Sequence, residues 1–160
     1  MSVEDRITLA KVIYNRFGDE LKSRYNEILR KLDEAIDETW RYMRSTGITE
    51  ICKQCALETG SCCRRWVEDL YDEIILVINL LLGVEFPKER FKEELCFFCG
   101  KNGCMLRARE GTCVTYLCDR IDVDRTEFNK VCSLELGYLS LLKVKIRRFI
   151  DQRVPRSSSP

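Results

Sequence analysis

Cysteine is the residue type in this sequence best suited to chemistry, because the chain holds ten cysteines and no histidine. Cys52 and Cys55 form a C-x2-C pair, a spacing that lets two sulfurs reach one metal ion. The adjacent Cys62 and Cys63 weigh against a local disulfide, because a disulfide needs α-carbons about 5.5 Å apart, farther than those of neighbouring residues. We interpret this stretch as metal ligands that point to one site or to two nearby sites.

A second group of cysteines lies farther along the chain, in "CFFCGKNGCMLRAREGTCVTYLC". It supplies Cys96, Cys99, Cys104, Cys113 and Cys118. With no imidazole in the chain, a metal bound here would be held mainly by thiolates, which favours zinc or an iron–sulfur cluster. The ferredoxin-type C-x2-C-x2-C run and the C-x3-C-x2-C run of radical enzymes are both absent, so zinc is the expected cofactor and an iron–sulfur cluster is the alternative.

The spacing of these cysteines resembles that of the YkgJ-like family, whose members are described as zinc- or iron-chelating. The family pattern is a C-x2-C pair leading to a CC pair, then a C-x8-C segment that contains an arginine, and then a further cysteine. The residues that match this pattern are Cys52, Cys55, Cys62, Cys63, Cys104, Arg109, Cys113 and Cys118. The resemblance covers residues 52–118 and implies a metal-binding module without an assigned role.

Together these observations predict eight metal ligands, which could form two four-thiolate zinc sites or one larger cluster. The ligands are Cys52, Cys55, Cys62, Cys63, Cys96, Cys104, Cys113 and Cys118. Cys99 is the spare thiol and is able to replace Cys96 as a ligand. Cys132 lies on the apolar stripe of a helix, where we expect a buried core thiol.

The compartment decides how ten cysteines are interpreted. The chain begins "MSVEDRITLAK", with acidic residues where a secretory signal needs a basic start and an apolar run, so we expect a cytoplasmic protein. In a reducing cytosol, dense cysteines indicate metal binding or catalysis. Disulfide stapling is a third interpretation, because the number is even and intracellular proteins of hyperthermophiles are sometimes disulfide-rich.

Apolar residues recur at spacings of three and four over most of the chain, which predicts an all-α protein. We expect one or two helices between Ser2 and Gly47, a central helix over 65–82, a shorter helix that begins near Pro87, and a long last helix that ends at Pro155. Trp40, Trp66 and Phe128 are expected in the core. Asn79 lies inside an apolar run too short to cross a bilayer, and we expect it to be a satisfied buried amide.

This order of elements positions the cysteines. Residues 99–118 are expected as loops with at most a short helix, and the helices before them return the chain toward the first cysteine group. The sequence therefore predicts a helical bundle with a cysteine-rich metal site formed by two loops at one end. Residues 1–154 form the single domain, and residues 155–160 form a disordered tail.

Catalytic motifs are missing from the sequence. There is no histidine base, no phosphate-cradling glycine loop and no G-x-S-x-G motif, so we expect a structural or interaction module rather than an enzyme. The alternative is an iron–sulfur or thiol redox protein, with nucleic acid as a partner of the basic segment "KVKIRRFIDQRVPR". Cations near a helix C-terminus also complement the helix dipole. The near-heptad N-terminal pattern leaves self-association open, and the net charge of +1 indicates no partner.

Overall fold

The computed structural model describes residues 1–155, so residues 156–160 of the expected disordered tail lie outside the described part. Helix α1 (Val3–Ser45) begins at a capping box, in which the Ser2 hydroxyl accepts the Asp5 amide and the Asp5 carboxylate accepts the Ser2 amide, each at 3.0 Å. The N-terminal region is therefore a single helix. Its backbone leaves helical geometry at Tyr25 (φ −114°, ψ 19°), and the helix kinks there.

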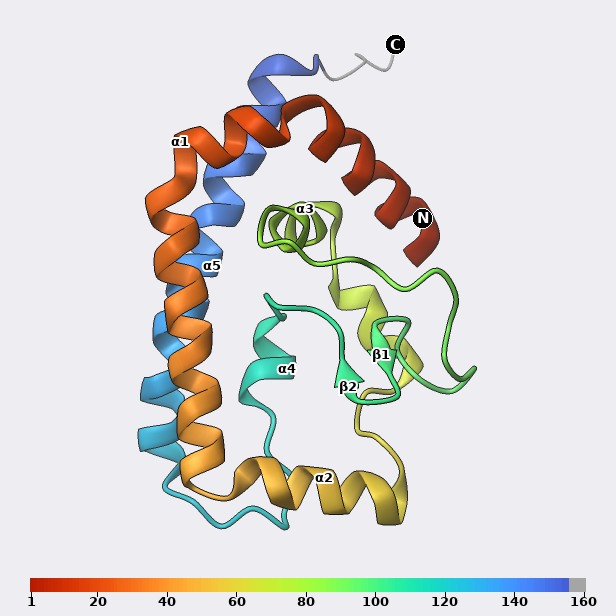
Figure 1. Ribbon diagram of the computed structural model, residues 1–160, viewed down its shortest axis with the longest axis vertical. Coiled ribbons are helices and arrows are strands. Elements are labelled where there is room, and N and C mark those ends of the chain that lie inside the picture. Colours follow the sequence, from red (N-terminus) through yellow and green to blue (C-terminus); the bar gives the residue numbers. More distant parts are fainter. Residues whose placement is uncertain (156–160) are drawn as a thin grey trace.

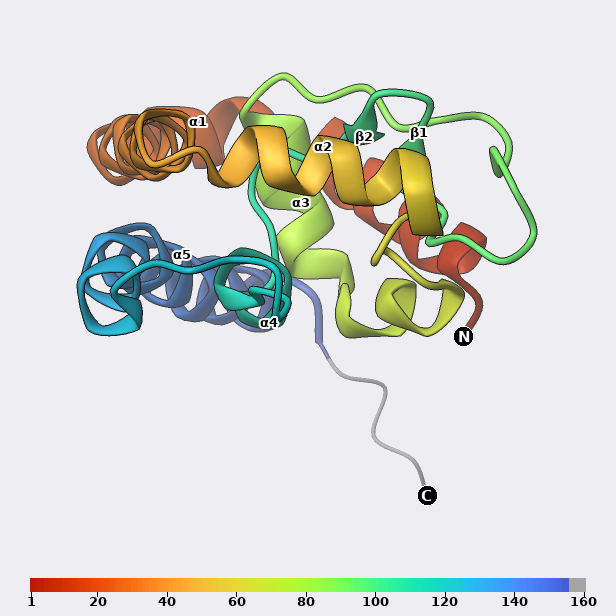
Figure 2. The same ribbon diagram turned by 90° about the horizontal axis from the view of Figure 1, so that it is seen from below.

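The kink lets the two halves of α1 cover different neighbours. The first half passes over α3 (Glu73–Leu81), and the second half runs beside α5 (Arg125–Arg153), as Figures 1 and 2 show from two directions. Helix α3 is almost completely buried between them. The expectations of a mainly helical protein and of a long last helix are confirmed. The apolar residues of the near-heptad pattern of α1 pack on α3 and α5 of the same molecule.

The central helix expected over 65–82 is interrupted. A 3₁₀ helix, η1 (Arg65–Leu70), comes first, and α3 starts afresh after Asp72, whose carboxylate caps it by accepting the Ile75 amide at 2.9 Å. The apolar spacing continues through the break, which is why periodicity alone hides it. A second cap begins α5, where Asp124 accepts the amides of Thr126 and Glu127.

The helix expected to begin near Pro87 is wrong: none of residues 82–98 is helical. Besides a local bond from the Leu95 amide to the Lys92 carbonyl, backbone groups of this segment pair across the molecule. The Arg65 amide donates to the Glu94 carbonyl at 3.0 Å, and the Cys96 amide donates to the Cys63 carbonyl at 2.8 Å. This pairing satisfies groups that a helix would otherwise satisfy, and it joins the two cysteine-bearing segments.

The remaining elements are small, and most of them surround the cysteines. Helix α2 (Ile48–Thr59) follows Gly47, whose positive φ of 80° favours glycine, and it places Cys52 and Cys55 on a helix rather than on the expected loop. Strands β1 (Cys99–Gly100) and β2 (Gly103–Cys104) form an antiparallel hairpin, and α4 (Gly111–Thr115) is a single short helix. The expectation for 99–118 is confirmed apart from the hairpin.

The buried amide of Asn79 fixes the loop that follows the hairpin. Its Nδ2 donates to the carbonyls of Ile75 and Ala108, and its Oδ1 accepts the amides of Arg107 and Ala108 at 2.8 and 3.0 Å. The prediction of a satisfied buried amide is confirmed. Arg107 extends the attachment to α1, because its guanidinium forms ion pairs with Asp33 and Asp37.

Replacing Asn79 by leucine is therefore expected to destabilise the fold by about 2–4 kcal/mol, because the backbone amides of Arg107 and Ala108 lose their buried acceptor. Urea unfolding followed by circular dichroism measures this cost. Asn129→Leu makes the same chemical change at an exposed position of α5 and is expected to change the free energy of unfolding by less than about 0.5 kcal/mol. Equal costs for the two variants would contradict the role assigned to Asn79.

Three cations of the basic C-terminal segment bind carboxylates of the protein itself. Lys143 pairs with Asp72 and Glu110, Arg147 with Asp72 and Glu73, and Arg153 with Glu20. These pairs attach α5 to α3, to the loop before α4 and to α1. Within residues 1–155, no helix combines the length and the apolar character needed to span a membrane.

Candidate metal centre

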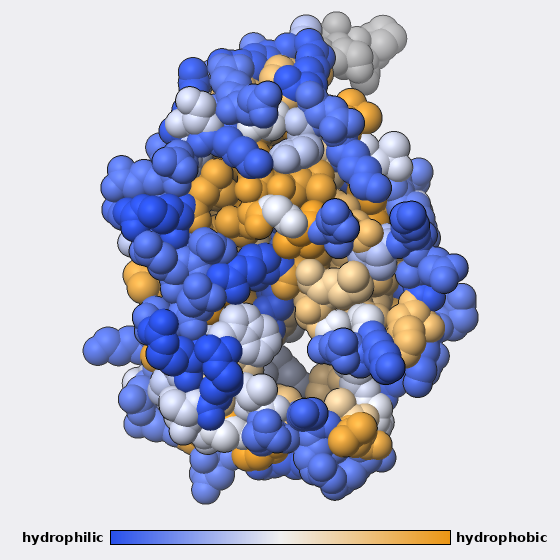
Figure 3. Space-filling model, viewed as in Figure 1, coloured by the Kyte–Doolittle hydropathy of each residue, from blue (hydrophilic) through white to orange (hydrophobic). Residues whose placement is uncertain are grey.

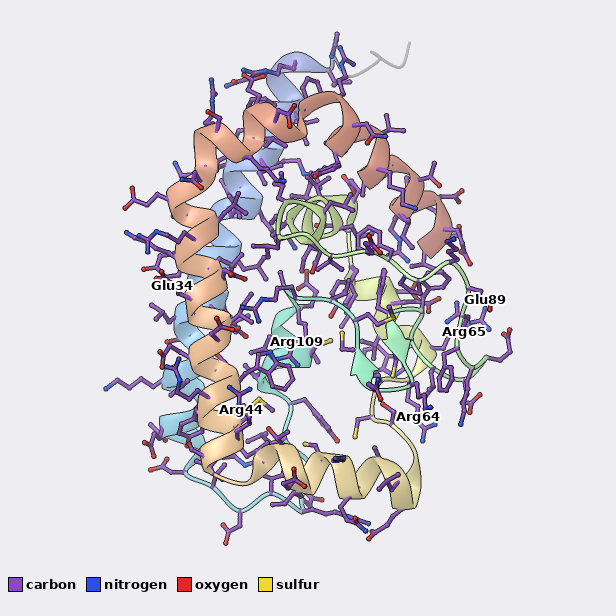
Figure 4. The ribbon with its side chains drawn as sticks, in the orientation of Figure 1. Glu34, Arg44, Arg64, Arg65, Glu89 and Arg109 are labelled. Carbon is purple, nitrogen blue, oxygen red and sulfur yellow. The ribbon has the colours of Figure 1, made fainter. Side chains whose placement is uncertain are left out.

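The cysteines line the interior of a ring formed by α1, α2 and the segments that carry the hairpin and α4 (Figures 1 and 4). All ten are free thiols. Nine of them fall into two groups according to which thiols lie near enough to interact electrostatically. We call these the inner group, Cys63, Cys96, Cys99, Cys104 and Cys113, and the outer group, Cys52, Cys55, Cys62 and Cys118.

Cys63 is the common neighbour of the inner group. Its thiol is hydrogen-bonded to that of Cys99, and it lies close enough to the other inner thiols to influence the pKa of each. The Ser61 hydroxyl lies 3.7 Å from the Cys99 sulfur and accepts the Cys63 amide at 3.1 Å. The bond from Cys99, together with Ser61 and the nearby Arg109 cation, lowers the pKa of Cys63 despite its partial burial.

Backbone amides position two other inner sulfurs in the same way. The Phe98 amide donates to the Cys96 sulfur, and the Leu106 amide donates to the Cys104 sulfur, so each sulfur accepts from the second residue after it. The hairpin aligns the two turns, because Cys99 and Cys104 are paired residues of β1 and β2. Amide donors of this kind stabilise thiolates, which are the form of cysteine that binds metal.

The fifth inner thiol is held from α4 by a buried tyrosine. The Tyr71 hydroxyl bonds to the Cys113 sulfur and also accepts the Glu110 amide at 3.4 Å. Tyr71 is 1% exposed, and this burial raises the pKa of its hydroxyl well above its usual range, so it stays a neutral donor. No sequence motif marked Tyr71, which lies between η1 and α3 in the stretch "EDLYDE".

A buried ion pair anchors the hairpin side of the inner group. Glu68 and Arg90 face each other with side chains about 10% exposed, and Arg90 Nη2 donates to Glu68 Oε1 at 2.8 Å. Glu68 Oε2 also accepts the Phe97 amide at 2.9 Å, and Arg90 donates to the Leu95 carbonyl at 2.7 Å. The pair therefore fixes the backbone on both sides of Cys96.

A cavity of about 520 Å³ opens beside the inner group. Its walls combine the inner thiols and Cys62 of the outer group with Arg109 and three aromatic residues, Trp66, Tyr71 and Tyr116. Trp66 was expected in the core but is 59% exposed, because η1 turns it toward the cavity mouth, whereas Phe128 is buried as expected. Figure 3 shows this face of the molecule hollowed below its middle, with apolar side chains gathered above the hollow.

Arg109 is a cation that lies beside the inner thiols. Its guanidinium stacks 4.4 Å from the centre of the Trp40 ring and reaches into the interior of the ring of elements (Figure 4). It favours the ionised forms of Cys63, Cys104 and Cys113. Among residues 1–155, its Nη2 is buried without a hydrogen-bond partner, as is Oε1 of the neighbouring Glu135, whose pKa is raised by burial. Arg109 therefore places a positive charge where thiolates would gather negative charge.

The outer group is built on α2. Cys52 and Cys55 are three positions apart on this helix, Cys62 follows the turn at Gly60, and Cys118 approaches from the segment between α4 and α5. Arg120 connects the two sides, since its guanidinium bonds to Glu58 of α2 at 2.6 Å and lies near the Cys55 and Cys118 thiols. Two thiols of the outer group, Cys52 and Cys62, are exposed, whereas Cys55 is buried and Cys118 half-buried. No inner thiol is exposed: Cys96 and Cys99 are buried and the other three are half-buried.

Burial sets the protonation of most of these thiols. It raises the pKa of Cys104 to about 11 and that of Cys96 to about 12, and it also raises the pKa of Cys52, Cys62 and Cys113. Neighbouring thiols add to the increase, since thiolates repel each other. A group of this kind is ionised only when a cation compensates for the repulsion, so cation binding would release protons.

The eight predicted ligands divide evenly between the two groups, with the spare Cys99 in the inner one. Cys63 joins the thiols of the second sequence cluster, and Cys118 joins those of the first. Within residues 1–155, no three or more cysteine, aspartate or glutamate side chains converge closely enough to hold an ion. The thiols of each group thus lie near one another but do not converge on a common point. Coordination of an ion would require them to rotate toward such a point.

Cys132 belongs to neither group. It is 0% exposed, and it packs in a smaller core cluster with Ile48, Val114 and Phe128. The expectation of a buried core thiol is confirmed.

Comparisons of the chain with protein-family models, with curated proteins and with solved structures find no significant match. The resemblance to the YkgJ-like family therefore stays an expectation, and function has to be argued from the site itself.

Proposed function

We propose that this chain is a metal-binding protein in which cysteine thiolates hold zinc, and that the metal makes it a structural or interaction module. The observation that carries the proposal is the gathering of nine thiols from separate segments around the interior of one helical ring, all of them free. A chance distribution of ten cysteines gives no reason for such gathering. Four thiolates per site suit a zinc ion.

The surroundings of the thiols support the same proposal. Peptide amides, the Ser61 hydroxyl and the Tyr71 hydroxyl all face inner sulfurs, and Arg109 and Arg120 lie beside the inner and outer groups. A four-thiolate zinc site carries a net charge of about −2, which such donors and cations stabilise. The residues present fit a thiolate-bound metal, and the metal would supply a cross-link between segments that are far apart in the sequence.

An iron–sulfur protein is the second candidate, and the cavity favours it. A volume of about 520 Å³ lined by six cysteines exceeds what a single ion requires. Its aromatic walls would also limit solvent access, which influences the reduction potential of a cluster.

Anaerobic purification followed by elemental analysis distinguishes the candidates. Colourless protein with stoichiometric zinc is expected under the proposal, and brown protein with iron and acid-labile sulfide would establish the second candidate instead. Protein that takes up neither metal, and whose thiols titrate as disulfides under native conditions, would overturn both.

Replacing Cys99 is expected to leave metal binding intact, whereas replacing Cys96 should weaken it by about 10–100-fold. The Cys96 sulfur accepts a peptide amide, while the Cys99 sulfur lies against the Ser61 hydroxyl and the Gly100 carbonyl at 3.9 Å. Competition with a chromophoric chelator measures the affinities of Cys99→Ser and Cys96→Ser. The reverse order of affinities would show that Cys99 is the ligand.

A further inference from the structure

We propose that the thiols form two separate metal sites, divided between the adjacent residues Cys62 and Cys63, and that the outer site exchanges its ion with thiol-bearing acceptors. The inner site comprises Cys63, Cys96, Cys104 and Cys113, and the outer site comprises Cys52, Cys55, Cys62 and Cys118. This inference rests on the proposed function and assigns each ligand to one ion.

The division follows from the backbone around Cys62 and Cys63. The Cys63 carbonyl accepts the Cys96 amide at 2.8 Å, which aligns Cys63 with the segment leading to the hairpin. Cys62 precedes this pairing, and the thiols of Cys55 and Cys118 influence its pKa more than that of the adjacent Cys63 does. The chain bends at this pair, because the Arg64 amide donates to the Cys62 carbonyl at 2.9 Å. Cys63 therefore lies in the segment paired with Cys96, whereas Cys62 lies on the side of the chain that comes from α2.

The two sites differ in their access to solvent. Inner thiols are held by the hairpin, Tyr71 and the backbone anchored by Glu68, and two of the five are almost fully buried. Cys52 and Cys62 of the outer group are exposed. Transfer of a metal to another thiol begins when the incoming sulfur reaches the ion, and only an exposed site allows this approach. The outer ion passes to the acceptor thiolates unchanged in oxidation state, and the protons that they lose go to the freed protein thiols.

The transfer of the outer ion to thiolates defines the chemistry of the acceptor. The acceptor presents two or more thiols close together, as a small dithiol or a cysteine-rich peptide does. The exposed apolar side chain of Leu57 lies on the same helix as Cys52.

Zinc alone is the probe for the test. Anaerobic apoprotein loaded with Zn²⁺ is expected to bind two ions and to release them to a chromophoric chelator in two phases of equal amplitude, the slower by at least about tenfold because its site is shielded. Cys62→Ser should abolish the fast phase only, and Cys63→Ser should abolish the slow phase only. Cys118→Ser and Cys113→Ser repeat the comparison at positions away from the adjacent pair, and Cys132→Ala is the control that keeps both phases.

Loss of both ions in Cys62→Ser as well as in Cys63→Ser would show one joint cluster and overturn the division. A single release phase in the wild-type protein would overturn the difference in access. Failure of the wild-type protein to bind any zinc or iron would instead refute the proposed function itself. Circular dichroism of each variant establishes that a lost phase reflects a lost site rather than an unfolded chain.

Discussion

Removal of the metal is expected to lower the melting temperature by about 10–20 °C, corresponding to about 5 kcal/mol of stability. The helical frame of α1, α3 and α5 has its own apolar core and should stay folded. The segment from α2 to Arg64 is mostly exposed and has few buried side chains, so the loss should be concentrated there. We therefore expect limited proteolysis of the metal-free protein to begin in residues 56–64.

Calorimetry of protein before and after chelation, with metal removal verified by elemental analysis, measures this effect. Return of the melting temperature after zinc is added back is the control for damage by the chelator. An unchanged melting temperature in verified metal-free protein would show that the cysteines do not stabilise the fold through a metal.

Glu68→Ala is expected to destabilise the protein by about 3–5 kcal/mol, because it leaves the Arg90 guanidinium buried without its carboxylate. The Phe97 amide loses its acceptor at the same time. Since these contacts fix the backbone on both sides of Cys96, the variant should also bind metal more weakly at the inner group.

Glu93→Ala is the matched control. Glu93 pairs with Arg65 at 2.9 Å, but both side chains are more than half exposed, so its loss should cost less than about 1 kcal/mol. Denaturant unfolding compares the two variants directly. Equal costs would mean that the Glu68–Arg90 pair does not anchor the hairpin side of the centre.

The elements predicted correctly from the sequence are those whose apolar stripes are long. Helices α1 and α5 follow such stripes, and each begins at a side-chain cap, Ser2 or Asp124. Helix α2 was not predicted because only Ile48 and Cys55 of its residues are buried, which leaves no stripe to recognise. The segment after Pro87 has helical spacing, yet its amides pair with the backbone near Cys63, a long-range contact that local periodicity does not contain.

In the candidate site, too, some features could be predicted from the sequence and others depend on the tertiary structure. Residue chemistry and spacing suggested the cysteines as candidate ligands, and the resemblance to the YkgJ-like family directed attention to Arg109. The assignment of Cys62 and Cys63 to different groups depends on how the chain pairs after Gly60, and the contribution of Tyr71 depends on the break between η1 and α3. Both are tertiary features, and neither has a signature in a single sequence.

X-ray absorption at the edge of the bound metal tests the central claim most directly, because it reports the atoms that coordinate the ion. Anaerobically purified protein is expected to show a shell of four sulfur atoms, at about 2.3 Å if the metal is zinc. A shell dominated by oxygen or nitrogen at about 2.0–2.1 Å would contradict thiolate binding by the two cysteine groups.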